Sequence, residues 1–175
     1  MTLLDELAAF VFNVAFHRFS PTTIEQIEAH LFDSLGALIA GAKTAEMKAH
    51  FELTKGLGRD GGQGQSPGVR PFLSAPLPEA LFLTCVAIRL TEVDDIDLLS
   101  CTTPSSIVVP TALCLASSAR VSGAQFLESL AAGYDVITRL GAAVDGPKIL
   151  YRGVWPTYLF GPIGSAAVSS KILGL

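Results

Sequence analysis

Residues 122–143 read SGAQFLESLAAGYDVITRLGAA, and this stretch decides the fold class. Its apolar side chains recur three or four residues apart, the spacing that places them on one face of an α-helix. They are Phe126, Leu127, Leu130, Tyr134, Ile137 and Leu140. Ser122 with Gln125 matches a capping box and predicts a helix over 123–143. Gly133 and Gly141 lie on one face with Ile137 between them, which predicts tight packing against another helix.

The same helical spacing extends to both sides of this stretch. It predicts further helices over 3–16, 45–55, 79–91, 108–119 and 157–173. Another helix passes from Ile24 to Leu38, and Thr22 with Glu25 is a candidate capping box at its start. A glycine inside a helix costs about 1 kcal/mol relative to alanine, so Gly36 predicts a close helix–helix contact.

Short runs of alternating apolar and polar residues do not dominate anywhere in the chain. We therefore predict an all-α fold, a helical bundle in which residues 1–175 form a single helical domain. A loop rich in glycine and proline interrupts it at about 56–78. Residues 56–61 formally match GxGxxG, but no strand precedes the glycines and prolines follow them. Because dinucleotide binding needs both a strand and a helix N-terminus there, we predict a mobile loop instead.

The composition points to a protein surface that is covered by other protein. The chain has 175 residues, of which 50% are hydrophobic and only 16% charged, whereas soluble domains carry about 25% charged residues. So few charges predict a homodimer or a partner protein chain that hides apolar surface. The net charge of −4 gives no basic field for nucleic acid.

Cysteines and apolar segments bear on the compartment. The three cysteines form no CxxC pair and cannot all pair within one chain, which favours reduced thiols and a cytoplasmic protein. No basic segment precedes an apolar run at the N-terminus, so no signal peptide is expected. The most apolar stretches, 31–42 and 154–175, are too short or are interrupted by prolines and a lysine, so no membrane span is expected.

An acidic cluster is the strongest local feature that could carry chemistry. It consists of Glu92, Asp94, Asp95 and Asp97. Such crowding is favourable with a cation, a basic partner or raised pKa values, and the alternative is a solvated helix end. We expect neither a metal nor a cofactor, because the cluster lacks the remaining ligands and the glycine of an EF-hand loop. The histidines, His17, His30 and His50, show no zinc-site spacing and are expected at the surface or at helix ends.

The order of several segments resembles the MmgE/PrpD family, which includes 2-methylcitrate dehydratases and cis-aconitate decarboxylase. Residues 31–36 and 40–41 resemble its early helix, residues 92–95 its D-x-D-D motif, and residues 103–113 its H-P-S segment and following helix. Residues 122–141 resemble the next helix and residues 152–157 its R-G-F-H-P-T segment. The resemblance covers nearly the whole chain. The resemblance implies that this chain is part of a helical domain that dimerises. It also implies a lid-like domain, because family members continue past the position of Leu175 into one. We therefore expect this chain to be one part of a larger or split protein.

The chain departs from the family pattern at positions that matter for proton transfer. Thr103 and Trp155 stand where the family has histidines, and Arg89 and Asp97 replace two more at the ends of the acidic stretch. Glu92 replaces an aspartate and Ile96 a threonine. Histidine is the usual group that exchanges protons near neutral pH, and neither threonine nor tryptophan does so. The pattern keeps the scaffold and loses proton donors.

Two functions remain open from the sequence. In the first, the chain belongs to an enzyme, a lyase or dehydratase or a repurposed isomerase or cyclase acting on a small carboxylated substrate. The candidate catalytic residues are Glu92, Asp94, Asp95 and Thr103, and the candidate substrate-binding residues are Arg89, Ser105, Arg152 and Trp155. Arginines recognise carboxylates through paired hydrogen bonds. In the second, the chain is a non-catalytic homologue that supports a partner subunit.

Overall fold

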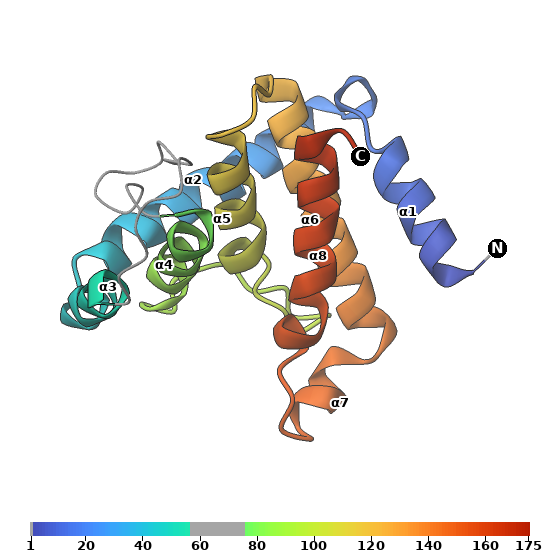
Figure 1. Cartoon of the computed structure of the whole chain (residues 1–175). Helices are drawn as coiled ribbons and strands as arrows, with labels where there is room; N and C mark the ends of the chain where they lie inside the picture. Colours follow the sequence, from blue (N-terminus) through green and yellow to red (C-terminus); the bar gives the residue numbers. More distant parts are fainter. Residues whose placement is uncertain (1, 57–75) are drawn as a thin grey trace.

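The computed structural model describes residues 2–56 and 76–175, most of which lie in helices (Figure 1). In chain order these are α1 (Leu3–Asn13), a 3-10 turn (Phe16–Arg18), α2 (Pro21–Ala42), α3 (Ala45–Gly56), α4 (Leu77–Arg89), α5 (Ser105–Ala116), α6 (Gly123–Ala143), α7 (Gly146–Leu150) and α8 (Pro156–Leu173). Within this described part there is no strand, only an isolated bridge between Asp97 and Thr102. The all-α prediction is confirmed.

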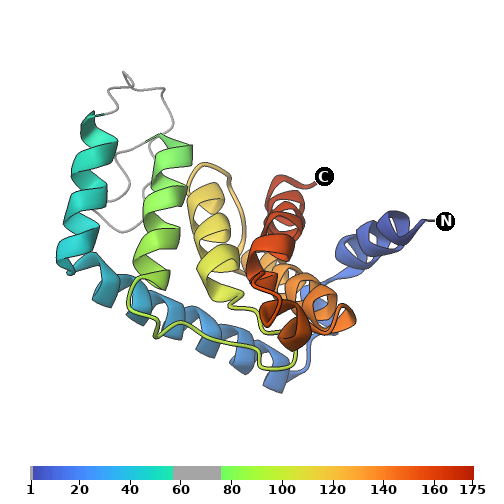
Figure 2. The same cartoon turned by 90° about the horizontal axis from the view of Figure 1, so that it is seen from below.

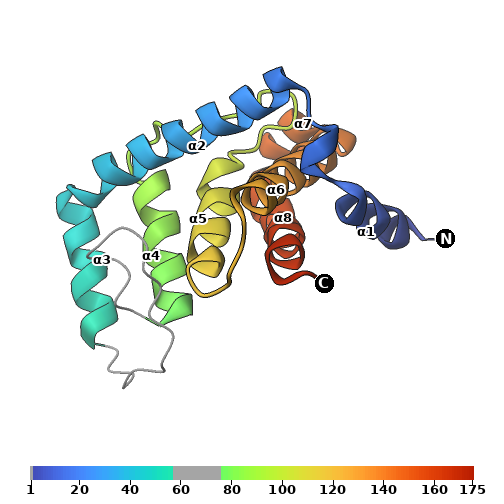
Figure 3. The same ribbon diagram turned by 90° about the horizontal axis from the view of Figure 1, so that it is seen from above.

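Helices α4, α5 and α8 stand side by side, and α2 runs across one end of this row (Figures 2 and 3). Helix α3 packs beside α4 at the outer end, and α6 pairs with α8 along most of its length. Helix α1 projects away at the opposite end of the row. Among the residues that are described, none of the helices has both the length and the apolar character needed to cross a bilayer.

The core lies around α5, which packs against α2, α4, α6 and α8. Helix α5 is the most enclosed, since Val108, Val109, Ala112 and Cys114 are at most 1% exposed. Because Gly133 has no side chain, α5 and α8 pack closely against α6 at this position. A Cβ there would lie 2.5 Å from a methyl group of Val168. The predicted interhelical contact at Gly133 is confirmed. Gly141 is equally close to its neighbours, but these belong to the connection at Ser100 and Thr102 and not to a helix.

The prediction for Gly36 is wrong. Nothing lies within 4 Å of a Cβ built on Gly36, because this residue faces away from the bundle. The close approach occurs at Gly41, one turn further on, where a Cβ would lie 1.9 Å from the carbonyl oxygen of Ala87 in α4. The C-terminal end of α2 therefore crosses α4. The sequence spacing of apolar residues does not show at which turn two helices cross.

Helix boundaries differ from the predictions for local reasons. Helix α2 begins at Pro21 with Ser20 as its N-cap, not at the Thr22–Glu25 pair, because proline fits the first helical position. Helix α1 stops at Asn13, and the turn after it is held by a hydrogen bond of 2.7 Å from the Phe16 N–H to Glu128 Oε1 of α6. Helix α5 begins at Ser105, so Pro110 lies inside it. Helix α4 begins at Leu77, two residues before its predicted start. Residues 57–75 of the predicted loop, including most of the GxGxxG match, lie outside the described residues.

Ser122 caps α6 as predicted, but Gln125 does not complete a capping box. The Gln125 side chain instead donates to the carbonyl oxygen of Lys171 at 2.9 Å and fastens the end of α8 to the start of α6. The surface carries many large apolar side chains: Leu3, Leu4 and Phe12 of α1 and Phe32 of α2 are each more than 70% exposed. This agrees with the low charged fraction, and the oligomeric state stays a prediction.

Candidate functional site

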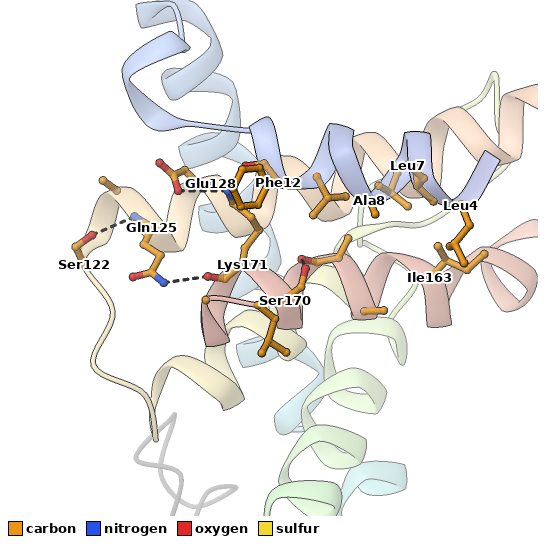
Figure 4. Close-up of a pocket in the computed structure, with 17 residues that line it drawn as sticks. Leu4, Leu7, Ala8, Phe12, Ser122, Gln125, Glu128, Ile163, Ser170 and Lys171 are labelled. Atoms are coloured by element: carbon orange, nitrogen blue, oxygen red, sulfur yellow. Dashed lines mark hydrogen bonds and ion pairs between the residues drawn. The ribbon is translucent and has the colours of Figure 1, made fainter. Parts of the chain in front are cut away.

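One cavity lies between α1, α6 and α8 and has a volume of about 700 Å³ (Figure 4). None of the site residues predicted from the sequence lines it. Its charged groups hold the chain together: Lys171 Nζ donates to the Val14 carbonyl oxygen at 2.6 Å and lies 3.8 Å from Glu128 Oε2. Glu128 in turn accepts the Phe16 N–H. Because these charges anchor the segment after α1, this cavity is a poor candidate for catalysis.

A second cavity, of about 590 Å³, lies between the end of α4, the start of α5 and the start of α8. It brings together Arg89, Glu92, Thr103 and Trp155, all predicted from the sequence as site residues. The other lining residues are Phe82, Cys85, Val86, Leu90, Ser106, Ile107, Thr157 and Tyr158. We name this space the Arg89 cavity. Its volume is in the range of ordinary small-molecule sites.

The guanidinium of Arg89 is held on three sides. Its Nη1 lies 3.0 Å from Asp94 Oδ1, its Nη2 lies 3.3 Å from Glu92 Oε1, and its Cζ lies over the Trp155 ring, 4.6 Å from the centroid. The two carboxylates differ in environment, because the Asp94 side chain is 1% exposed and that of Glu92 is 77% exposed. The ion pair with Asp94 is therefore firmly fixed, whereas water competes for the one with Glu92.

Burial raises the pKa of the Asp94 carboxyl above its usual value, although Arg89 opposes this rise. Among the described residues, Asp94 Oδ2 has no hydrogen-bond partner. An aspartate in this environment holds Arg89 in place, and its burial leaves a substrate no access to it. Asp94 thus positions the guanidinium and lies behind the cavity wall.

Glu92 has a left-handed backbone, with φ of 53°. This conformation costs a non-glycine residue about 1 kcal/mol and persists only where the surroundings enforce it. It follows a tight turn in which the Glu92 N–H donates to the Arg89 carbonyl oxygen at 3.1 Å. The turn places the carboxylate of Glu92 at the open side of the cavity, next to the guanidinium.

Thr103 lines the cavity but is committed to structural hydrogen bonds. Its N–H donates to Thr157 Oγ1 at 2.9 Å, and the two hydroxyls are 3.3 Å apart. Ser106 Oγ donates to the Thr103 carbonyl oxygen at 2.9 Å. These bonds join the connection before α5 to the first turn of α8, which positions Trp155 and the cavity wall.

Asp95 and Ser105 lie outside the Arg89 cavity, in a cluster with a histidine that the sequence did not single out. His30 Nδ1 of α2 lies 3.1 Å from Asp95 Oδ2, and the Ser105 N–H donates to Asp95 Oδ1 at 3.0 Å. The imidazole packs on the Tyr134 ring, 5.1 Å between centroids. Burial and the nearby Asp95 carboxylate raise the pKa of Tyr134, so its phenol is protonated at neutral pH. Arg152 is exposed after α7 and does not line the cavity.

Asp95 stabilises the N-terminus of α5, since its carboxylate accepts the first helical N–H. We expect Asp95→Ala to lower the free energy of unfolding by about 2 kcal/mol, because a charge-assisted hydrogen bond and the pair with His30 are both lost. Asp33→Ala, which removes an exposed carboxylate of α2, is the control and should change stability by less than about 0.5 kcal/mol. Urea unfolding of both variants measures this. Equal stability of the two would contradict the capping role.

Comparison with known proteins agrees with this architecture. A family profile described as the MmgE/PrpD N-terminal domain matches residues 5–175, nearly the whole chain. The chain therefore belongs to the MmgE/PrpD family. It is similar to the cis-aconitate decarboxylase-like protein oryM of Aspergillus oryzae (strain ATCC 42149 / RIB 40), with 44% identity over 55 residues. That match covers 31% of this chain and 11% of the relative.

Two of the departures from the family pattern prove to be neighbours. Arg89 and Trp155 stand where the resemblance places histidines, and in the structure the guanidinium lies on the indole. They are separated by sixty-five residues in the chain, so no sequence spacing could have indicated this contact. Where the resemblance implies two histidines, this chain has a permanent cation that lies over an aromatic ring, and neither group titrates near neutral pH.

Proposed function

We propose that the Arg89 cavity is this chain's part of the active site of an enzyme acting on a small carboxylated molecule, as a lyase or dehydratase or as an isomerase or cyclase. The observation that supports this best is the convergence of four predicted residues on one cavity of ligand size: Arg89 from the end of α4, Glu92 from the turn after it, Thr103 from the connection before α5, and Trp155 from the start of α8. The cavity is open and not enclosed. A second copy, a partner chain or a further domain would complete it.

In this proposal Glu92 is the acid and base. Its carboxylate takes a proton from the carbon next to the substrate carboxylate, so that the C–H electron pair becomes an enolate and the proton resides on Glu92. The guanidinium of Arg89 stabilises the charge that develops on the carboxylate oxygens. An isomerisation needs only this group, because Glu92 can return the proton to another carbon. An elimination needs a second proton donor for the leaving hydroxyl, which the completing chain or domain would supply.

The alternative is a non-catalytic homologue that supports a partner subunit. Two observations favour it. Arg89 already forms ion pairs with two carboxylates, and the Thr103 hydroxyl forms a hydrogen bond with that of Thr157. Under this alternative the chain supports a partner subunit and converts no substrate.

Turnover separates the two functions. The purified chain, alone and with any co-encoded partner, is incubated in D₂O with a panel of mono-, di- and tricarboxylates that includes 2-methylcitrate, citrate and cis-aconitate, and NMR follows product and deuterium incorporation. We expect turnover, and we expect Glu92→Gln to lower it about 100-fold because the base is lost. Glu25→Gln, an exposed change on α2, is the control. Turnover that survives Glu92→Gln would show that Glu92 is not the acid and base. If the wild-type chain turns over no compound of the panel, the non-catalytic homologue is favoured.

A further inference from the structure

The lining of the Arg89 cavity also restricts the substrate class. We infer that the cavity binds a molecule with one carboxylate at one end and an apolar, aromatic-sized body, in preference to a polycarboxylate. This inference rests on the proposed function, in which the cavity is a substrate site. It goes further, because the proposed function leaves the number of carboxylates and the character of the rest of the molecule open.

The charges that this chain contributes to the cavity favour a ligand with a single carboxylate. Arg89 is the single cation among the lining residues that the structure describes, and Glu92 and the buried Asp94 bring two carboxylates to its edges. A second or third ligand carboxylate would face these acidic groups without a cation of its own. Such like-charge contacts are unfavourable.

One of these carboxylates can be exchanged for that of a ligand. Asp94 is 1% exposed and fixed at 3.0 Å from Nη1, whereas Glu92 is 77% exposed and lies 3.3 Å from Nη2. Exposed ion pairs contribute little stability, so a ligand carboxylate can replace Glu92 at Nη2 at small cost. The displaced Glu92 carboxylate then lies beside the carboxylate end of the ligand, the place that the proposed acid–base role requires.

The rest of the lining offers a ligand few polar partners. The hydroxyls of Thr103 and Thr157 bond to each other, and Ser106 donates to the Thr103 carbonyl oxygen. Burial raises the pKa of Cys85 to about 12, so this side chain is a neutral thiol. The remaining lining is aliphatic or aromatic: Phe82, Val86, Leu90, Ile107, Trp155 and Tyr158.

Aromatic rings at the open part of this lining favour an aromatic-sized body. Phe82 is 48% exposed and Tyr158 is 75% exposed, and the Tyr158 ring lies 5.9 Å from that of Trp155 at 52°. Exposed rings around a cavity that already contains an indole gain by stacking against a planar apolar group. A small hydrophilic polycarboxylate would bury none of this surface.

Trp155 is the chain's only tryptophan, so its fluorescence reports binding in this cavity directly. The full chain is titrated with 3-phenylpropionate, with the neutral 3-phenylpropionamide and with citrate. We expect a saturable change with 3-phenylpropionate, and binding about tenfold weaker or worse for the other two, since each lacks one of the two features. Citrate binding as tightly as 3-phenylpropionate would overturn the inference, as would the absence of saturable binding of 3-phenylpropionate below about 10 mM.

Variants of Glu92 test whether a ligand carboxylate replaces that of Glu92 at Arg89 Nη2. Arg89 itself is left unchanged, because its removal affects folding. Glu92→Gln removes the competing carboxylate and should tighten 3-phenylpropionate binding about threefold, because the exposed ion pair no longer competes. Arg139→Gln, at an exposed arginine on α6, is the control and should leave the affinity unchanged. Weaker binding by Glu92→Gln would contradict the exchange. Selective binding without turnover of any carboxylate would overturn the proposed function alone, whereas turnover of tricarboxylates with unselective binding would overturn this inference alone.

Discussion

Gly41→Ala is expected to lower the free energy of unfolding by about 3 kcal/mol, at the upper end for an overpacked position. The added Cβ would lie 1.9 Å from the Ala87 carbonyl oxygen and 2.8 Å from its carbonyl carbon. Both are backbone atoms of α4, so no side chain can turn aside to make room. The two helices would have to move apart where α2 crosses the row of helices, which loosens the contacts of the buried Leu38 and Ala87.

Gly36→Ala is the matched control, since it makes the same change in the same helix, where nothing lies within 4 Å of the new Cβ. Alanine is a better helix former than glycine, so we expect stability to rise by about 0.5 to 1 kcal/mol. Urea unfolding of the two variants beside the wild type gives both values. Destabilisation by Gly36→Ala, or tolerance of Gly41→Ala, would show that α2 and α4 cross elsewhere.

Arg89→Leu is expected to cost about 3 kcal/mol at neutral pH, because it leaves the buried Asp94 without its cation. The cost depends on pH in a defined direction. Burial holds the folded pKa of Asp94 above the ordinary value of 3.8, and without Arg89 this pKa rises further. The folded state then binds a proton more readily than the unfolded chain, so stability falls as pH rises from about 3.8 through the folded pKa.

The free energy of unfolding of Arg89→Leu and of the wild type is measured at about pH 4.5 and at about pH 7.5. The difference between the two proteins should be larger at the higher pH. Adding Asp94→Asn to Arg89→Leu removes the ionisable group and should abolish the additional pH dependence. Arg139→Leu is the matched control: its partner Asp135 is 38% exposed, and we expect a loss below about 1 kcal/mol. A loss that is the same at both pH values would show that Asp94 does not carry the effect.

Much of the candidate site was accessible from the sequence, and its assembly was not. The acidic cluster, Thr103 and Trp155 stand out by composition and by the family resemblance, and four of the predicted residues do line one cavity. The division of the cluster could not be predicted. Asp94 and Asp95 are adjacent in the chain, yet one pairs with Arg89 and the other with His30, because the irregular connection between α4 and α5 turns their side chains apart.

The sequence alone determined the longer helices and the fold class, because helical spacing and caps such as Ser122 act over three or four residues, whereas the short helix α7 was not predicted. The tertiary structure alone decided where the helices cross and which side chains meet. The sequence pattern predicts the close contact at Gly36 and ends the helix before Gly41, and only the packing of α4 against α2 shows that Gly41 makes it. The contact of Arg89 with Trp155 and the pairing of His30 with Asp95 join residues sixty-five or more apart, and such contacts are selected by the burial of whole helix faces.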